Sequence, residues 1–232
     1  MGIKNLNVAK NADIDLSKLN LLDGKRAFWE DFDEVAATTI TSLYGFSQIV
    51  AATGAATCVN PSLGKLDCPN NNDKVLIFGG SQWHSDRNCK MTTRVTAITS
   101  LASVNMQFGW GDNAAMVIDG PVSDHDWAYL EFRAGTNDGK WLLNTRIAGS
   151  AAVAVDTGIP VASATIYNLS VELLPSGRVI AKVNGDIVQS GSSAAIKTGA
   201  ADWQPFARIS ASAGGGKFTT LDTFAVYENR TA

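Results

Sequence analysis

The sequence predicts an all-β protein, an antiparallel β-sandwich that follows an N-terminal arm. The clearest observation is a three-strand meander over residues 167–189, where apolar and polar residues alternate and two turn sequences interrupt the alternation. A period of two is typical of a half-buried strand. Asn184-Gly185 between two such strands is typical of a type I′ hairpin, because both central residues need a positive φ. The second observation is that further strand-like segments follow one another at spacings of about 8–14 residues, which favours a sandwich or barrel over alternating strands and helices.

The arm comprises residues 1–26, and the sandwich domain residues 27–232. The arm is polar except for a leucine-rich stretch that could form two helical turns, which are marginal without a partner. Two interpretations stay open, a frayed terminus and a segment that docks on another subunit or protein. In the second, the docking residues are Leu16, Leu19, Leu21 and Leu22.

Strands are predicted in chain order wherever apolar runs or alternation reach strand length. They fall at residues 43–50, 75–78, 91–97, 104–110, 115–118, 127–133, 141–147, 152–155, 167–173, 179–183, 187–188, 201–211 and 217–227. Residues 51–73 are rich in Ala, Thr, Asn, Pro and Gly without useful periodicity. This segment is predicted to be a long, partly irregular loop, and long loops are often functional.

Composition narrows the function classes. A chain of 232 residues with 45% hydrophobic residues can bury roughly 70–75% of its unfolded surface, so one large domain is expected. Charged residues make up only 18%, and the net charge of −3 provides no broad positive field, so no nucleic-acid partner is expected. No secretory leader and no apolar run of membrane-spanning length is recognised, so we expect no membrane partner.

The sequence predicts no metal or cofactor. Cys58, Cys68 and Cys89 fit no zinc spacing, and three reduced thiols are favoured over a Cys58–Cys68 bridge. Candidate calcium ligands occur in loops, but without the spacing of a calcium-binding loop. They are Asp112, Asn113, Asp119, Asp124 and Asp126, with His125 beside the last two.

One strand presents a candidate ligand or partner surface. Along residues 127–133, Ala128, Leu130 and Phe132 form the apolar face, which leaves an aromatic pair and a charged pair on the other. Aromatic residues next to charged ones are typical of binding surfaces. The predicted surface residues are Trp127, Tyr129, Glu131 and Arg133, with Arg94 and Arg146 as possible extensions and Trp110 assigned to the core. The alternative is that the arm or the long loop covers this face.

Six short phrases, in order, carry a resemblance to a known family. They are GWGD at 109–112, AYLEF at 128–132, DTG at 156–158, YNLSVE at 167–172, GRVIAKVNG at 177–185 and LDTF at 221–224. Over residues 75–228 the chain resembles the concanavalin A-like (laminin G-like) jelly roll, particularly the versions in structural proteins of tailed bacteriophages. The resemblance implies two packed antiparallel sheets, a concave face that binds glycans in lectin members, and a capsid-decoration, tail or fibre role in phage members.

Glycoside hydrolases and polysaccharide lyases share this fold, so catalysis has to be argued from the site. Retaining hydrolysis needs two carboxyls about 5–5.5 Å apart, which the hydrolases of this fold supply as Glu-x-Asp-x-Glu on one strand. The nearest match is residues 30–34, where Asp31 and Asp33 share a face but Phe32 takes the place of the central Asp. We therefore expect no catalytic residues and a protein that is not an enzyme.

The resulting prediction is a bacteriophage virion structural protein, a capsid decoration (cement) protein that stabilises the shell. It would be made in the host cytoplasm and would contact the major capsid protein or another virion protein as a homo-oligomer, such as a trimer. Two alternatives stay open, a glycan-binding module of a tail fibre or lectin that uses Trp127 and Tyr129, and a glucanase or lyase of the same fold.

Overall fold

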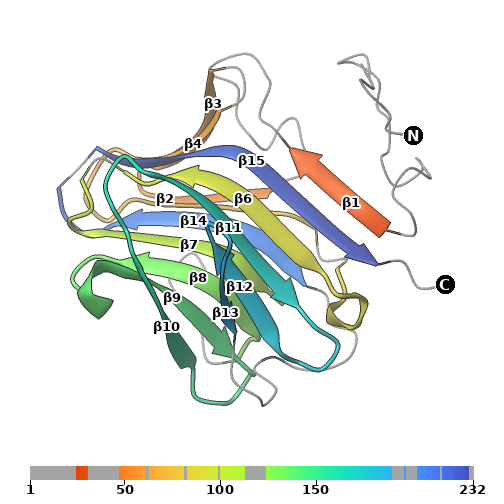
Figure 1. The fold of residues 1–232 in the computed structure, drawn as a ribbon. Coiled ribbons are helices and arrows are strands. Elements are labelled where there is room, and N and C mark those ends of the chain that lie inside the picture. The colour runs from red at the N-terminus through yellow and green to blue at the C-terminus, as the bar shows by residue number, and fades with distance from the viewer. Residues whose placement is uncertain are drawn as a thin grey trace, which may run out of the picture.

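The computed structural model shows two antiparallel β-sheets packed face to face, so the predicted all-β sandwich is confirmed (Figure 1). The structure describes residues 25–30, 47–60, 63–80, 83–98, 100–112, 124–189, 196, 203–214 and 216–229. The arm leucines, the strand predicted at 115–118, and Asp31 and Asp33 lie outside these residues, as does the part of the 1–26 arm before Lys25. Within the described part of the chain, no helix has the length and apolarity to cross a membrane.

Sheet A has eight strands, in the order β13-β12-β11-β6-β15-β4-β3, and β1 also pairs with β15. Their bounds are β1 (Lys25–Glu30), β3 (Ala55–Asn60), β4 (Leu63–Cys68), β6 (Lys90–Thr96), β11 (Ile166–Leu173), β12 (Val179–Val183), β13 (Asp186–Gln189) and β15 (Lys217–Asn229).

Sheet B has seven strands, in the order β10-β9-β8-β7-β14-β5-β2. Their bounds are β2 (Ser47–Ala51), β5 (Lys74–Phe78), β7 (Val104–Gly111), β8 (Trp127–Arg133), β9 (Lys140–Arg146), β10 (Val153–Pro160) and β14 (Gln204–Ala211). Two short 3₁₀ turns, Ser85–Arg87 and Asn137–Gly139, lie in the connections.

The core lies between the inner faces of the two sheets. Trp141 is fully buried there and makes edge contacts with Phe108, Phe132 and Tyr167, with ring centroids 5.6–6.4 Å apart. Trp110 is also fully buried, and its indole Nε1 donates a 2.9 Å hydrogen bond to the carbonyl oxygen of Val171 on the opposite sheet. The assignment of Trp110 to the core is therefore confirmed.

The predicted meander forms strands β11, β12 and β13. Val183 pairs with Asp186, so the β12–β13 turn has two central residues, Asn184 and Gly185, with φ of 53° and 95°. These signs are those of a type I′ turn. The preceding turn places Gly177 at φ 78°, and its N–H donates to the Leu174 carbonyl oxygen at 2.9 Å.

The prediction of an irregular loop over residues 51–73 is wrong, because this segment contains the β3–β4 hairpin on sheet A. Burial alternates along β4, but its inward residues are Gly64, Leu66 and Cys68, only one of which is a large apolar residue. The hydrophobic pattern was therefore too weak to show a strand.

Cys68 and Cys89 are buried, free thiols, so the Cys58–Cys68 bridge does not form. Burial, reinforced by the negative charges of Asp73 and Asp67, raises the pKa of the Cys68 thiol to about 12. At neutral pH this sulfur is protonated and packs as a small apolar group.

Candidate functional site

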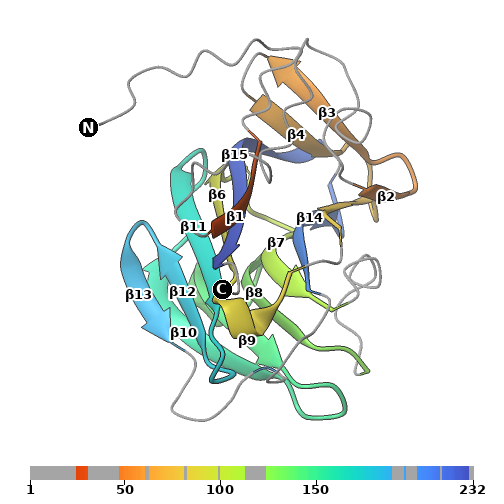
Figure 2. The same cartoon turned by 90° about the vertical axis from the view of Figure 1, so that its right-hand side faces the viewer.

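The candidate site is the outer face of sheet B around β8, here called the β8 face. Ala128, Leu130 and Phe132 belong to the core between the sheets. Trp127 and Tyr129 form a separate buried cluster with Leu76 and Phe206. Because side chains alternate along a strand, this second cluster lies on the opposite side of sheet B. Figure 2 shows the two layers, with β11 to β13 in one and β7 to β9 in the other.

Strand register brings the residues of this face together from β7, β8, β9 and β14. The pairs across neighbouring strands are Asn105 with Arg133, Gln107 with Glu131 and Arg208, Gly109 with Tyr129 and Phe206, Asn144 with Tyr129, and Arg146 with Trp127. The face therefore has an aromatic half near Trp127 and a polar half near Arg133.

The aromatic half is closely packed around a glycine. The rings of Trp127 and Tyr129 lie 6.3 Å apart between centroids, and those of Tyr129 and Phe206 lie 5.9 Å apart. A Cβ added to Gly109, between Tyr129 and Phe206 in the register, would lie 2.3 Å from the Ala128 carbonyl oxygen and 2.5 Å from the Tyr129 Cα. Only glycine fits this position, because a closer approach than about 3 Å forces the backbone to move.

Glu131 is the centre of the polar half. Its Oε1 accepts hydrogen bonds from Asn105 Nδ2 at 3.0 Å, Gln107 Nε2 at 2.8 Å and Arg133 at 3.0 Å. Its Oε2 accepts one from Asn144 Nδ2 at 3.0 Å. Only 4% of Glu131 is exposed, so the carboxylate is desolvated and these four donors replace water.

A further hydrogen bond extends the network to β14. Arg208 is buried, and its guanidinium donates to Gln107 Oε1 at 2.9 Å. Burial lowers the pKa of Arg208, whereas the negative charge of Glu131 acts to raise it. Gln107 therefore connects the carboxylate to a buried cation that balances its charge.

Burial also raises the pKa of Tyr129, and the carboxylate of Glu131 adds to this effect. The Tyr129 phenol is therefore neutral over the physiological pH range. Its O–H can act as a hydrogen-bond donor as well as an acceptor.

Three buried polar atoms of the β8 face have no hydrogen-bond partner among the described residues. They are the Trp127 indole Nε1 and the Arg146 Nε, both donors at the aromatic end, and the Asn105 Oδ1, an acceptor at the polar end. The Arg146 guanidinium lies over the Trp127 ring, 5.2 Å from its centroid. Buried polar groups are nearly always paired, so unpaired ones at both ends of one face need an explanation.

The connection from β7 to β8 is fixed at its two ends. Asp112 Oδ2 accepts a 3.1 Å hydrogen bond from the Asp126 N–H, and its Oδ1 lies 2.8 Å from His125 Nδ1. The Asp126 side chain accepts a 2.8 Å hydrogen bond from the Ala148 N–H. Asn113, Asp119 and Ser123 lie outside the described residues, and the described residues hold no group of three metal-binding side chains.

The structure brings the four predicted surface residues onto one face but exposes them unequally. Trp127 and Tyr129 are each 2% exposed, whereas half of the Arg133 side chain is exposed. Arg146 lies on the same face, where its guanidinium contacts the Trp127 ring. The extension by Arg94 is wrong, because β6 belongs to sheet A and Arg94 lies on the far side of the sandwich.

The donors that surround Glu131 were not predicted from the sequence. Asn105 and Gln107 alternate with apolar residues on β7, which was a usable signal. Asn144 and Arg208 come from strands whose register with β8 and β7 no local pattern shows, so only the sheet pairing reveals them.

Comparison with known proteins identifies the fold. No family model and no curated protein sequence matches the chain. The structure is similar to a Bacillus licheniformis β-glucanase, with 11% identity, a TM-score of 0.57 and coverage of 88% of this chain and 98% of that one. It is equally similar to the carbohydrate recognition domain of Emp47p, with 10% identity, a TM-score of 0.58 and the same coverage. A carbohydrate esterase from the Shiga toxin-encoding bacteriophage phi24B gives 13% identity, a TM-score of 0.56 and coverage of 87% and 97%.

These neighbours show the fold, which is the concanavalin A-like jelly roll of lectin domains and glucanases. They also correct the expectation that the protein is not an enzyme. Besides the β-glucanase, a glycoside hydrolase family protein and a glycosidic hydrolase have this fold, so the enzymatic alternative has to be kept. The expectation failed because it rested on the spacing of carboxyls in residues 30–34. Catalytic carboxyls can come from any strand of a sheet face, so the pattern of one segment cannot exclude them.

Proposed function

We propose that the chain recognises a carbohydrate through the β8 face, with Glu131 at its centre. The observation that carries this proposal is the set of unpaired polar atoms, two donors beside Trp127 and one acceptor on Asn105. A hydroxyl group both donates and accepts. These atoms are buried, so the proposal requires the face to open when a ligand binds. A sugar can then satisfy both kinds of atom with one chemical group, whereas an apolar ligand would leave them unpaired.

The Glu131 network supports this proposal because it fixes donor and acceptor groups before a ligand arrives. Asn105, Gln107 and Asn144 are held by the same carboxylate, so their amides have little freedom to rotate. Binding then costs less side-chain entropy than it would with mobile amides. The half-exposed Arg133 lies at the polar end and gives a ligand its first point of contact.

Turnover of a bound glycan is the enzymatic form of the same proposal. Glu131 is a carboxylate on a central strand of the sheet, where it could transfer a proton. A retaining mechanism needs a second carboxyl about 5–5.5 Å away. Glu131 is flanked on β8 by Tyr129 and Arg133, so this second group would have to come from another segment.

Binding and turnover can be tested together on the full chain. Calorimetric titration with β-glucan and α-glucan oligosaccharides should detect binding to at least one of them. Asn105→Leu removes the unpaired acceptor at nearly constant volume and should weaken binding about tenfold, or 1.4 kcal/mol. Asn229→Leu, at the exposed end of β15 on sheet A, is the matched control and should change affinity less than twofold. No binding to either series, or equal losses in both variants, would contradict the proposal.

A reducing-sugar assay separates the two forms of the proposal. If the wild type releases sugar and Glu131→Gln binds the oligosaccharide without releasing it, Glu131 transfers the proton. If the wild type binds and releases nothing, recognition alone is supported.

The virion role predicted from the sequence is kept as a second proposal. The phage-encoded neighbour, itself a carbohydrate esterase, bears on it only by sharing the fold. In this role a homo-oligomer would contact the major capsid protein through the arm leucines. Light scattering should then show an oligomer for the full chain and a folded monomer for a chain that starts at Arg26. An oligomer of equal size in both cases would contradict the docking role of the arm.

A further inference from the structure

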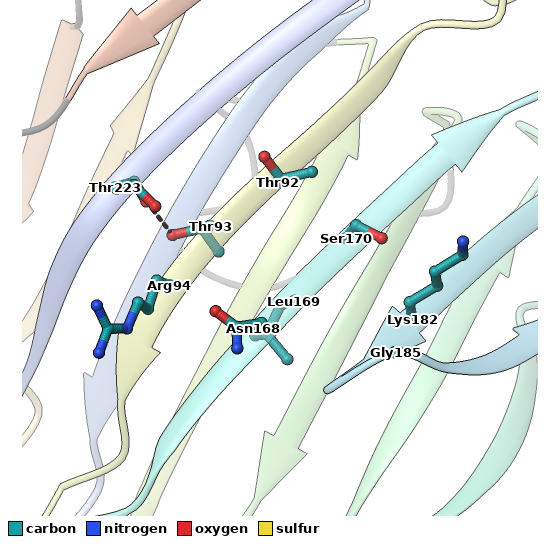
Figure 3. Close-up of a pocket in the computed structure, with 9 residues that line it drawn as sticks. All are labelled: Thr92, Thr93, Arg94, Asn168, Leu169, Ser170, Lys182, Gly185 and Thr223. Atoms are coloured by element: carbon teal, nitrogen blue, oxygen red, sulfur yellow. Dashed lines mark hydrogen bonds between the residues drawn. The ribbon is translucent and has the colours of Figure 1, made fainter.

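A separate pocket of about 260 Å³ lies on the outer face of sheet A, on the opposite side of the sandwich from the β8 face (Figure 3). It is lined by residues of β6, β11, β12, β15 and the β12–β13 turn, most of which have polar side chains, although apolar atoms make up most of the exposed lining. The polar side chains are Thr92, Arg94, Asn168, Ser170, Lys182 and Thr223.

A hairpin turn forms one wall of this pocket. The Asn168 N–H donates to Asn184 Oδ1 at 2.9 Å, and the Asn184 N–H donates to the Asn168 carbonyl oxygen at 2.8 Å. The β12–β13 turn is therefore attached to the edge of β11. This attachment fixes Gly185 at the rim and Lys182 beside it.

A β-bulge forms the opposite wall. Pairing of β15 with β6 shifts between Leu221 and Thr223, and the extra residue is Asp222. Bulges turn side chains in new directions, and here the carboxylate of Asp222 accepts a 2.5 Å hydrogen bond from the Arg94 guanidinium. The hydroxyl of Thr93 donates to the Thr223 carbonyl oxygen at 2.8 Å and stabilises the bulge.

The two walls leave positive charge on both sides of a row of neutral polar groups. Figure 3 shows Arg94 and Lys182 on opposite sides of Asn168 and Ser170. Arg94 shares its charge with Asp222, and about half of its side chain is exposed. No carboxylate in the described part of the chain pairs with Lys182. The pocket therefore has a net positive charge, because two cations face one anion.

We propose that this pocket binds the anionic sugar unit of an acidic saccharide, one that carries a carboxylate or a sulfate. The hydroxyls and the Asn168 amide can bond sugar hydroxyls, and Lys182 can pair with the acidic group. The volume is below the roughly 300–1,000 Å³ of pockets for drug-sized ligands, which fits one sugar unit better than a larger ligand. This site shares no residue with the β8 face, so the inference does not rest on the proposed function.

The test is an NMR titration of the full chain with three probes, oligogalacturonate, sulfated dextran oligosaccharides and neutral dextran oligosaccharides. At least one acidic probe should shift the amide signals of residues 168–170 and 182–185, and the neutral probe should bind at least tenfold more weakly. The acidic probe that binds more tightly identifies the acidic group. Lys182→Gln should weaken acidic binding at least fivefold. Lys90→Gln, on β6 outside the pocket, is the matched control and should change it less than twofold.

Several results would overturn this inference. They are binding of no acidic probe, equal binding of the neutral probe, or equal losses in the Lys182 and Lys90 variants, which would indicate diffuse attraction. Free sulfate or acetate that binds as tightly as the acidic saccharides would also overturn it, since the sugar would then contribute nothing. Asn105→Leu should leave this binding unchanged, so failure at the β8 face and failure here can be distinguished.

Discussion

The two outer faces of the sandwich carry similar residue types in different surroundings. On sheet B, Glu131 and Arg208 are buried, and the polar side chains join one network across β7, β8, β9 and β14. On sheet A, Arg94 makes a single ion pair with Asp222 and remains half exposed. Both faces are built from alternating strands, so the sequence pattern alone does not distinguish them.

The difference shows how burial changes the energetic role of a polar residue. An exposed ion pair such as Arg94–Asp222 typically contributes 0–1 kcal/mol, since water competes for both partners. A desolvated carboxylate has no water that could replace a lost partner. Each partner that is removed therefore leaves a buried group without a hydrogen bond. Substitutions should therefore be much more costly on the β8 face than on sheet A.

The largest effect is expected at Glu131. Glu131→Ala leaves the buried Arg208 without its compensating negative charge and four donors without an acceptor, so the free energy of unfolding should fall by about 3–5 kcal/mol. Glu172→Ala on β11, on the outer face of sheet A, is the matched control and should cost less than about 0.5 kcal/mol. Urea unfolding of both variants measures the two values. Equal losses would show that the two faces do not differ as the structure indicates.

The next effect is expected at Gly109. The methyl group of Gly109→Ala would meet backbone atoms of Ala128 and Tyr129, which cannot turn away as a flexible side chain would. We expect a loss of about 1–3 kcal/mol from overpacking, with a change in the near-ultraviolet circular dichroism of the Trp127 and Tyr129 cluster. An unchanged melting temperature and spectrum would mean that β7 and β8 are not paired in this register.

A loss in the same range, from backbone strain alone, is expected at the β12–β13 turn on sheet A. Gly185 has φ 95° with no atom near an added Cβ, so Gly185→Val would cost about 1–3 kcal/mol through strain without a clash. Gly185→Asn is the matched control, since Asn tolerates a positive φ better. Thermal unfolding should rank wild type above the Asn variant and the Asn variant above the Val variant. Any other order would contradict the type I′ geometry.

The smallest effect is expected at Asp73, between the last strand of the β3–β4 hairpin and β5, and it is lost in acid. Burial acts to raise the pKa of Asp73, but hydrogen bonds from Thr53 and Asn70 outweigh it and lower the pKa below its ordinary value of 3.8. A depressed pKa stabilises the folded state above the unfolded pKa, and this contribution is lost as the pH falls through the folded pKa. Asp73→Asn should therefore be less stable than wild type at pH 6, with a smaller difference at pH 2.5. A difference that stays constant with pH would contradict this linkage.

Much of the fold was predictable because most strands alternate clearly or have recognisable turns. The strand predicted at 127–133 coincides with β8, and Asn184-Gly185 fixed the register of the last hairpin of the meander. The β3–β4 hairpin was missed because its inward positions include Gly64 and Cys68 rather than large apolar residues. Local patterns predict strands only where the residues of one face share a property.

The candidate site was predictable only in part, for a physical reason. Alternation placed Trp127, Tyr129, Glu131 and Arg133 together, since all four are on one strand. Arg94 was assigned to the same surface because one-dimensional spacing does not show to which sheet a strand belongs. Gln107 and Arg208 approach Glu131 through strand pairing across long sequence separations, 24 and 101 residues for the two hydrogen bonds that connect them.

The reactivity of the Cys68 thiol can be used to measure how often the two sheets separate locally. Its Sγ donates a weak hydrogen bond across the sandwich to the Ile209 carbonyl oxygen, at 3.7 Å, and none of the residue is exposed. The thiolate is the form that attacks an alkylating reagent, and it is scarce when the pKa of the thiol is about 12. The rate at which Cys68 is alkylated therefore reports how often β4 separates from β14, and it would time the opening of the two layers without any engineered label.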